Sequence, residues 1–225
     1  IENEFLNGQK ILKSSFRYKS DNGMQKFCFG ELFGEDVISS IKRYIGNDDI
    51  KFFGRRVESI MVDIFSYIYN EIRKTSIQEE YQTVITVPAY FSNKERSIMR
   101  KVAEISGFKV MKVLNEPTAA IFAHGVNDCG IYGVYDFGGG TFDFSLIEYK
   151  NEVFNVIGTS GALNLGGDDI DNEITNYIHE KFDISIDELR KNDNRLSIQK
   201  FKESFKTNNN IELIIFGDIK KIHVY

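Results

Sequence analysis

The residues most able to do chemistry lie in one segment, residues 134–145, where three glycines separate two apolar runs and an aspartate flanks each side. The triglycine, residues 138–140, removes every Cβ from the bend, so the backbone can take positive φ angles and a ligand can approach the N–H groups directly. Asp136 ends one expected strand and Asp143 begins the next. Two hard oxygen ligands beside an anion site suit magnesium bound to a nucleotide.

A triglycine alone fits a plain hairpin with a glycine-rich loop equally well. The flanking carboxylates favour the ligand site, because burying them at the rim of apolar strands is costly unless a metal or a proton relay pairs with them.

Composition narrows the class of protein. The chain has 225 residues, 42% of them hydrophobic, and a formal net charge of −5 without a basic block, which argues against nucleic acid or an anionic membrane as a partner. We find no bilayer-length apolar run and no signal peptide. Cys28 and Cys129 lie far apart, which favours free thiols in a reducing cytoplasm.

The first half of the chain must supply elements that position the turn. Apolar residues in 57–74 recur at three- and four-residue steps and predict an amphipathic helix. The β-branched run 83–87, closed by Pro88, predicts a strand buried on both faces. Residues 36–45 predict a short helix that stops at Gly46.

Alternating helix and strand signals continue after that strand. Ser92 and Glu95 form an S-x-x-E capping box for a helix that ends at Gly107. A strand at 109–114 and an alanine-rich helix over 116–125 follow. This order is typical of α/β proteins.

The second half predicts a β-meander and then helices. Residues 130–136, 141–149 and 153–160 are the expected strands. Acidic residues after Gly167 begin one helix, and 197–206 predict a polar one.

Four motifs occur in order: ITVPAYF at 85–91, NEPTAA at 115–120, DFGGGTFD at 136–143 and LGGDDID at 165–171. Together they resemble the ATPase domain of the seventy-kilodalton heat-shock (DnaK-type) chaperones, most similarly the HscA type that serves iron–sulfur cluster assembly. The resemblance implies part of an actin-like ATPase (ribonuclease H-like) α/β fold, with two lobes that each hold a mixed sheet flanked by helices.

The resemblance implies catalytic roles for single residues. Lys42 matches a lysine that reaches the γ-phosphate, and Glu116 a glutamate near the attacking water. Asp136 matches a carboxylate that orients water on magnesium, and Asp143 one that helps to bind monovalent cations such as potassium. Thr141 closes the phosphate loop. Charge neutralisation and positioning account for most of phosphoryl-transfer catalysis.

Further residues match binding and switching positions of the family. Pro88 and Arg96 resemble a pair that switches between nucleotide states. The nucleotide-binding matches are Gly138, Gly139, Gly140, Thr141, Gly166, Gly167, Asp168, Glu203 and Lys206. Plainer interpretations stay open: Lys42 as a solvated helix end, Pro88 as a strand terminator, and Glu203 with Lys206 as a surface ion pair.

By the same resemblance, residues 1–82 and 83–127 are the outer and inner subdomains of lobe I, and 128–165 and 166–225 the inner and outer subdomains of lobe II. The family's first phosphate loop, later adenosine loop and peptide-binding domain have no counterpart here, so we expect a middle piece. Implied ligands are ATP or ADP and Mg²⁺. Implied partners of the full-length protein are an unfolded peptide or scaffold-protein client and a J-domain co-chaperone.

Three functions from different classes remain. The first is a chaperone ATPase whose hydrolysis gates peptide binding in the longer protein. The second is a catalytically inactive, truncated or decayed remnant. The third is another actin-like ATP user such as a sugar kinase, for which we find no further catalytic aspartate.

Overall fold

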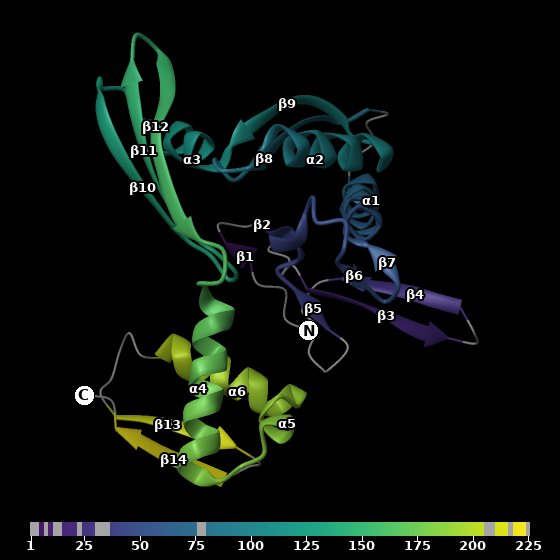
Figure 1. Cartoon of the computed structure of the whole chain (residues 1–225), viewed down its shortest axis with the longest axis vertical. Coiled ribbons are helices and arrows are strands. Elements are labelled where there is room, and N and C mark those ends of the chain that lie inside the picture. Colours follow the sequence, from purple (N-terminus) through teal and green to yellow (C-terminus); the bar gives the residue numbers. More distant parts are fainter. Residues whose placement is uncertain are drawn as a thin grey trace. The chain divides into compact units, whose positions relative to one another are not determined.

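The computed structural model describes residues 5–6, 9–10, 15–21, 24–29, 37–75, 80–204, 210–215 and 218–223 (Figure 1). These residues form a mixed α/β protein with several small sheets. They divide into two compact units, one continuous over residues 41–163 and one assembled from 1–40 and 164–225. The continuous unit contains the triglycine turn. The four subdomain boundaries expected from the sequence remain predictions.

The continuous unit begins with a short 3₁₀ helix and a two-residue-strand hairpin, and then alternates strands and helices. Its elements are η1 (Ile41–Tyr44), β6 (Lys51–Phe52), β7 (Arg55–Arg56), α1 (Val57–Thr75), β8 (Gln82–Val87), α2 (Asn93–Ile105), β9 (Lys109–Asn115), α3 (Glu116–His124), β10 (Gly130–Phe137), β11 (Phe142–Lys150) and β12 (Val153–Ala162).

Helix α1 confirms the periodicity seen in the sequence. Its first turns bury Val57, Ile60 and Ile64, and the helix packs against α2. The α2 cap is also confirmed: the Ser92 N–H donates to Glu95 Oε2 at 2.7 Å, and the Glu95 N–H donates back to Ser92 Oγ at 3.4 Å. This reciprocal cap fixes where the chain turns from the 88–91 loop into α2.

Strands β8 and β9 pair in parallel, with α2 as the connection between them (Figure 1). The prediction that β8 is buried on both faces is wrong. Ile85 and Val87 are buried, whereas Val84 is 53% exposed, so the strand alternates. The reason is that α2 packs against this two-stranded sheet, and among the described residues no second layer covers Val84.

The helix predicted over residues 36–45 is also wrong. Ile38 and Ser39 form a strand, β5 (Ile38–Ser39), which pairs with residues 15 and 16. Ser40 then has a φ of 53°, a left-handed value that interrupts a right-handed helix. Only the 3₁₀ turn η1 remains before Gly46, whose φ is 80°.

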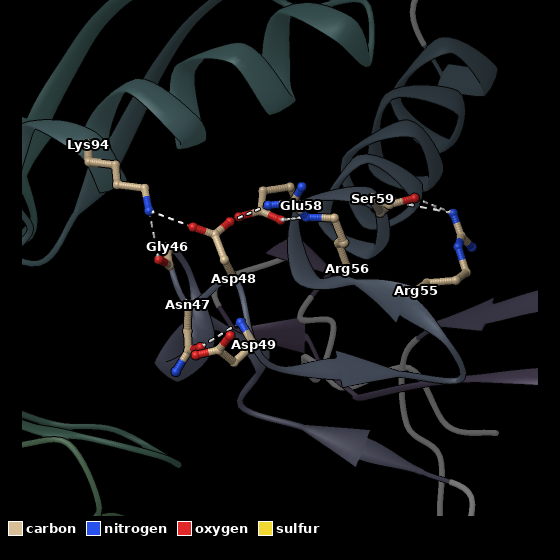
Figure 2. A network of polar contacts seen from close by, with 9 residues as sticks. All are labelled: Gly46, Asn47, Asp48, Asp49, Arg55, Arg56, Glu58, Ser59 and Lys94. Carbon is tan, nitrogen blue, oxygen red and sulfur yellow. Dashed lines mark hydrogen bonds and ion pairs between the residues drawn. The ribbon is translucent and has the colours of Figure 1, made fainter.

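A polar network fastens the end of η1 to α2 and to the β6–β7 hairpin (Figure 2). Lys94 Nζ donates to the Gly46 carbonyl at 3.1 Å and pairs with Asp48 at 3.0 Å. Arg56 pairs with the other oxygen of Asp48. These two cations hold the pKa of Asp48 below its ordinary value, Lys94 having the larger effect. The turn that carries Lys42 is therefore attached to the helix that follows the 88–91 loop.

Strands β10, β11 and β12 form the predicted antiparallel meander, and α3 contacts β10 and β11 (Figure 1). Ser145 and Ile147, on β11, are buried. Asn151 and Glu152 turn the chain between β11 and β12 with φ angles of 51° and 62°. The register between β10 and β11 places Asp136 directly opposite Asp143.

The second unit joins both ends of the chain. Its elements are β1 (Phe5–Leu6), β2 (Gln9–Lys10), β3 (Ser15–Asp21), β4 (Met24–Phe29), β5, α4 (Gly167–Phe182), α5 (Ile186–Leu189), α6 (Asn192–Ser204), β13 (Asn210–Ile215) and β14 (Asp218–His223). An apolar core links α4, α5 and α6 through Ile178, Leu189, Ile198 and Phe201. This core fixes the C-terminal half of α4 relative to α6.

Candidate functional site

The triglycine turn is open on one side. The Gly138 N–H donates to the Thr141 carbonyl at 2.9 Å and closes the turn between β10 and β11. A Cβ built on Gly139 would meet no heavy atom within 4 Å. None of the three glycines is among the described residues with positive φ, so the turn does not use that freedom. The glycines supply space for a ligand rather than an unusual backbone conformation.

The two aspartates beside the turn face each other across the hairpin. Burial is the main reason that the pKa of Asp143 lies above its ordinary value, and the charge of Asp136 raises it further. A hydrogen bond from Thr141 and the charge of Lys42 act in the opposite direction. The ionised pair therefore lacks full compensation, which an added cation would supply.

This donor set fits Mg²⁺. Magnesium is commonly held by one or two carboxylates and completes its shell with water and phosphate oxygens. Among the residues that the structure describes, no group of three or more His, Cys, Asp and Glu side chains could hold a metal alone. Asp136 and Asp143 would hold the ion together with oxygens of a ligand in the open turn.

A second charged pair joins two residues of the continuous unit that lie 74 positions apart in the chain. Lys42, on η1, places Nζ 3.0 Å from Oε1 and 3.2 Å from Oε2 of Glu116. Glu116 is the first residue of α3, and Pro117 follows it in the first turn. The charge of Lys42 also acts to lower the pKa of Asp143. The fold thus gathers a cation and three acids around the turn.

Tyr90 also belongs to this cluster, although sequence reasoning assigned it no role. Partial burial raises the pKa of its phenol above the ordinary value, and the charges of Asp143 and Glu116 add to that effect. The phenol therefore stays protonated and is a hydrogen-bond donor at neutral pH. Its position two residues after Pro88, where β8 ends, is the only sequence signal that could have indicated it.

Arg96 contacts the loop that begins at Pro88, and the switching role of this pair stays a prediction. The Arg96 guanidinium donates to the carbonyls of Pro88, Ala89 and Phe91 at 3.4, 3.1 and 2.9 Å. It also donates to Asn115 Oδ1 at 2.7 Å. Because Asn115 precedes Glu116 in the chain, one side chain connects the 88–91 loop to the start of α3.

Gly166, Gly167 and Asp168 lie at the start of α4, in the other unit. Gly166 is the N-cap residue of α4, and the Asp168 carboxylate accepts a hydrogen bond from Ser40 Oγ at 3.0 Å. Lys202 donates to the Gly167 carbonyl at 2.9 Å and pairs with Asp171 at 2.8 Å.

The sequence predicted roles for Glu203 and Lys206 but none for Lys202. Burial raises the pKa of Asp171, and the bond and charge of Lys202 oppose that rise. Glu203 is exposed and accepts a hydrogen bond from Gln199 at 3.2 Å along α6. Lys206 lies outside the described residues. The contact of Lys202 with the start of α4 could not be predicted from sequence because a separate helix, α6, carries Lys202.

This chain is similar to known proteins over most of its length. A family model described as Hsp70 protein matches residues 35–212. A chaperone protein HscA homolog of Rickettsia akari is 39% identical over 213 residues, covering 87% of this chain and 36% of the relative. An HscA homolog of Rickettsia prowazekii is 42% identical over 160 residues, covering 69% of this chain and 27% of the relative. The chain thus spans about a third or less of the length of these curated relatives.

No helix in the described part of the chain is both long and apolar enough to span a bilayer. The matched residues include η1, the triglycine turn, the start of α3 and the start of α4. The family's domain has the actin-like ATPase fold, with which the mixed α/β elements agree. The chain belongs to the Hsp70 family.

Proposed function

We propose that this chain is part of the nucleotide-binding domain of an ATP-dependent molecular chaperone. The observation that carries the proposal is the cluster of Lys42, Glu116, Asp136 and Asp143 around an open triglycine turn. A cation, paired acids and bare backbone N–H groups are the parts that phosphoryl transfer needs.

Each residue has a distinct part in this proposal. The backbone of residues 138–140 and Thr141 receives the nucleotide phosphates. Asp136 and Asp143 hold Mg²⁺, which supplies charge stabilisation at the phosphates when bound, and Asp143 contributes to a potassium site. Glu116 orients the attacking water.

Lys42 serves two anions. Its Nζ lies 3.0 Å from Glu116 Oε1, and it offers its ammonium to the γ-phosphate. Exchange between two anions needs a flexible, compact cation, and lysine provides one.

Residues outside this cluster complete the proposal. Gly166, Gly167 and Asp168 belong to a nucleotide-binding loop, and Glu203 with Lys206 contacts adenosine. Lys202 holds the start of α4 for that purpose, through Asp171 and the Gly167 carbonyl. Pro88 and Arg96 transmit the nucleotide state.

The similarity to HscA homologs extends the proposal to partners. A J-domain co-chaperone stimulates hydrolysis in the longer protein, and hydrolysis gates binding of an unfolded peptide or an iron–sulfur scaffold protein. We place the longer protein in a reducing compartment such as the cytoplasm, where thiols such as those of Cys28 and Cys129 persist.

The test measures nucleotide binding by calorimetry and ATP turnover, each with Mg²⁺ and with a chelator. Gly139→Val places a branched side chain in the open turn and should abolish binding; Gly158→Val, on β12, is the matched control because its Cβ also meets nothing within 4 Å. Asp136→Asn should remove the Mg²⁺ dependence, with exposed Asp128→Asn as its control. Equal binding by the unaltered chain and both site variants would refute the assignment.

A second experiment separates the chaperone ATPase from an inactive remnant. We expect the 225-residue chain to bind nucleotide but to hydrolyse it far more slowly than a polypeptide extended at both ends with the corresponding segments of a relative. Comparable turnover by the two polypeptides would overturn that expectation. Stimulation of the extended polypeptide by a J-domain protein tests the chaperone assignment itself.

A further inference from the structure

Gly161, near the end of β12, lies against the metal-binding aspartate rather than in the phosphate turn. The register of the meander pairs it with Asp143 on β11. A Cβ built on Gly161 would lie 2.4 Å from the Phe142 carbonyl oxygen, 2.8 Å from Asp143 Oδ1 and 3.3 Å from Asp143 Cα. Two of these three atoms are backbone, so no side-chain rotation relieves the overlap.

The approach is unusually close for paired strands. Directly opposite residues of antiparallel strands normally keep their Cβ atoms about 4.5–5.5 Å apart, which leaves room for both side chains. At this pair, the Asp143 carboxylate and the Phe142 carbonyl occupy the space that a second side chain needs. Gly161 is therefore the residue that admits the present position of the carboxylate.

Other glycines of the same sheet do not share this property. A Cβ on Gly158, three residues earlier in β12, would meet nothing within 4 Å. A Cβ on Gly133 would meet only the ring of Phe144, at 3.3 Å, and a ring edge is able to move aside. The constraint is specific to the strand position opposite Asp143.

The position of the carboxylate matters because of its neighbours. Asp143 accepts the hydrogen bond from Thr141, the last residue of the turn, and faces Asp136 across the hairpin. Rotation of the carboxylate away from Gly161 would break that hydrogen bond or separate the two acids. A hard cation that bridges both acids needs their oxygens in a fixed arrangement.

We propose that Gly161 is a positioning residue for a divalent cation, because its bare backbone keeps the Asp143 carboxylate beside Thr141 and Asp136. The inference rests on the proposed function, in which those two acids hold Mg²⁺. Gly161 lies outside the four sequence motifs, near the end of β12. It determines whether the oxygens of the cation site keep their arrangement.

The experiment titrates Mn²⁺ into the 225-residue chain and follows the free ion by electron paramagnetic resonance, with and without ADP. Mn²⁺ is a suitable probe because it shares the oxygen ligands of Mg²⁺. Gly161→Ala should weaken Mn²⁺ binding about tenfold to a hundredfold, the range for residues that orient metal ligands. Gly158→Ala should bind as the unaltered chain does, and Asp143→Asn should lose the ion.

Two readouts separate positioning from a general loss of structure. A structural defect would weaken ADP binding in chelator as much as in Mn²⁺, whereas a positioning role weakens only the Mn²⁺-dependent part. If Gly161→Ala fails to fold, Asp143→Glu keeps the glycine but carries the carboxylate past it. That variant should lose Mn²⁺ as Asp143→Asn does.

The outcomes for the two proposals differ. One outcome overturns the role of Gly161 and leaves the cation site standing. In that outcome Asp143→Asn loses Mn²⁺, whereas Gly161→Ala or Asp143→Glu keeps full Mn²⁺ affinity. Full affinity in Asp143→Asn, or no binding by the unaltered chain, overturns the cation site itself.

Discussion

The Lys42–Glu116 pair offers the sharpest energetic test of the site. Its two contacts, 3.0 and 3.2 Å, join side chains that are 38% and 22% exposed. A fully exposed ion pair contributes about 0.2–1 kcal/mol, and a hydrogen bond to a charged group about 1.5–3 kcal/mol. Partial exposure places this pair between the two cases. We expect a coupling free energy of about 1 kcal/mol at low salt.

A double-mutant cycle measures that coupling. The four chains are the unaltered one, Lys42→Met, Glu116→Gln and the double variant. Because the chain has two units, global unfolding need not be two-state, so amide hydrogen exchange within residues 41–163 should report the free energy of opening. Moderate salt should reduce the coupling only in part, since the pair is partly shielded from solvent.

One result would refute the reasoning. Distant, independent sites add to within about 0.3–0.5 kcal/mol, so a coupling smaller than that means that the pair contributes nothing specific. A second readout is independent of stability: loss of the Lys42 charge should raise the pKa of Asp143 further, as carbon-13 titration would show. An unchanged pKa would place the ammonium away from Asp143.

Three further outcomes follow from the same structure. Ile178→Ala empties part of the α4–α6 core, where Ile178 is fully buried, and should cost about 2–5 kcal/mol; a loss below about 1 kcal/mol by urea unfolding would contradict that packing. Ser92→Ala removes the α2 cap and should cost about 1 kcal/mol, whereas exposed Ser97→Ala should cost little, and equal losses would argue against the cap. Because the folded pKa of Asp143 lies above its ordinary 3.8, the ionised acid costs stability at neutral pH, and that cost should disappear as pH falls through the folded pKa. Mn²⁺ binding should decline over the same pH range, and Asp136→Asn should move the Asp143 titration to lower pH; an unmoved titration would contradict the opposed acids.

The sequence predicted the elements whose signals are local. The capping box of Ser92 and Glu95, the apolar periodicity of α1 and the meander all depend on residues within a few positions of each other. The failures depend on distant partners. Residues 38 and 39 became a strand because β3, more than twenty residues earlier, pairs with them. Val84 is exposed because one helical layer covers β8, which no property of the strand itself reveals.

The candidate site shows the same division. The triglycine and its aspartates could be read from sequence because they occupy one hairpin. The contact of Lys42 with Glu116 spans 74 positions, and the involvement of Tyr90 and Gly161 depends on how strands and loops meet. The family resemblance suggested Lys42 and Glu116 as separate site residues. Tyr90 and Gly161 became evident only from the packing and the strand register.

The discontinuity of one unit has a consequence for biosynthesis. Residues 41–163 form a unit from consecutive chain, so they are able to fold on the ribosome as soon as they have emerged. Residues 1–40 precede the continuous unit in the chain, yet the unit to which they belong also contains residues 164–225; the Ser40–Asp168 hydrogen bond alone spans 128 positions. Residues 164–225 therefore emerge only after the continuous unit, and translation that stalls near residue 163 would leave the discontinuous unit without the partners on which it depends.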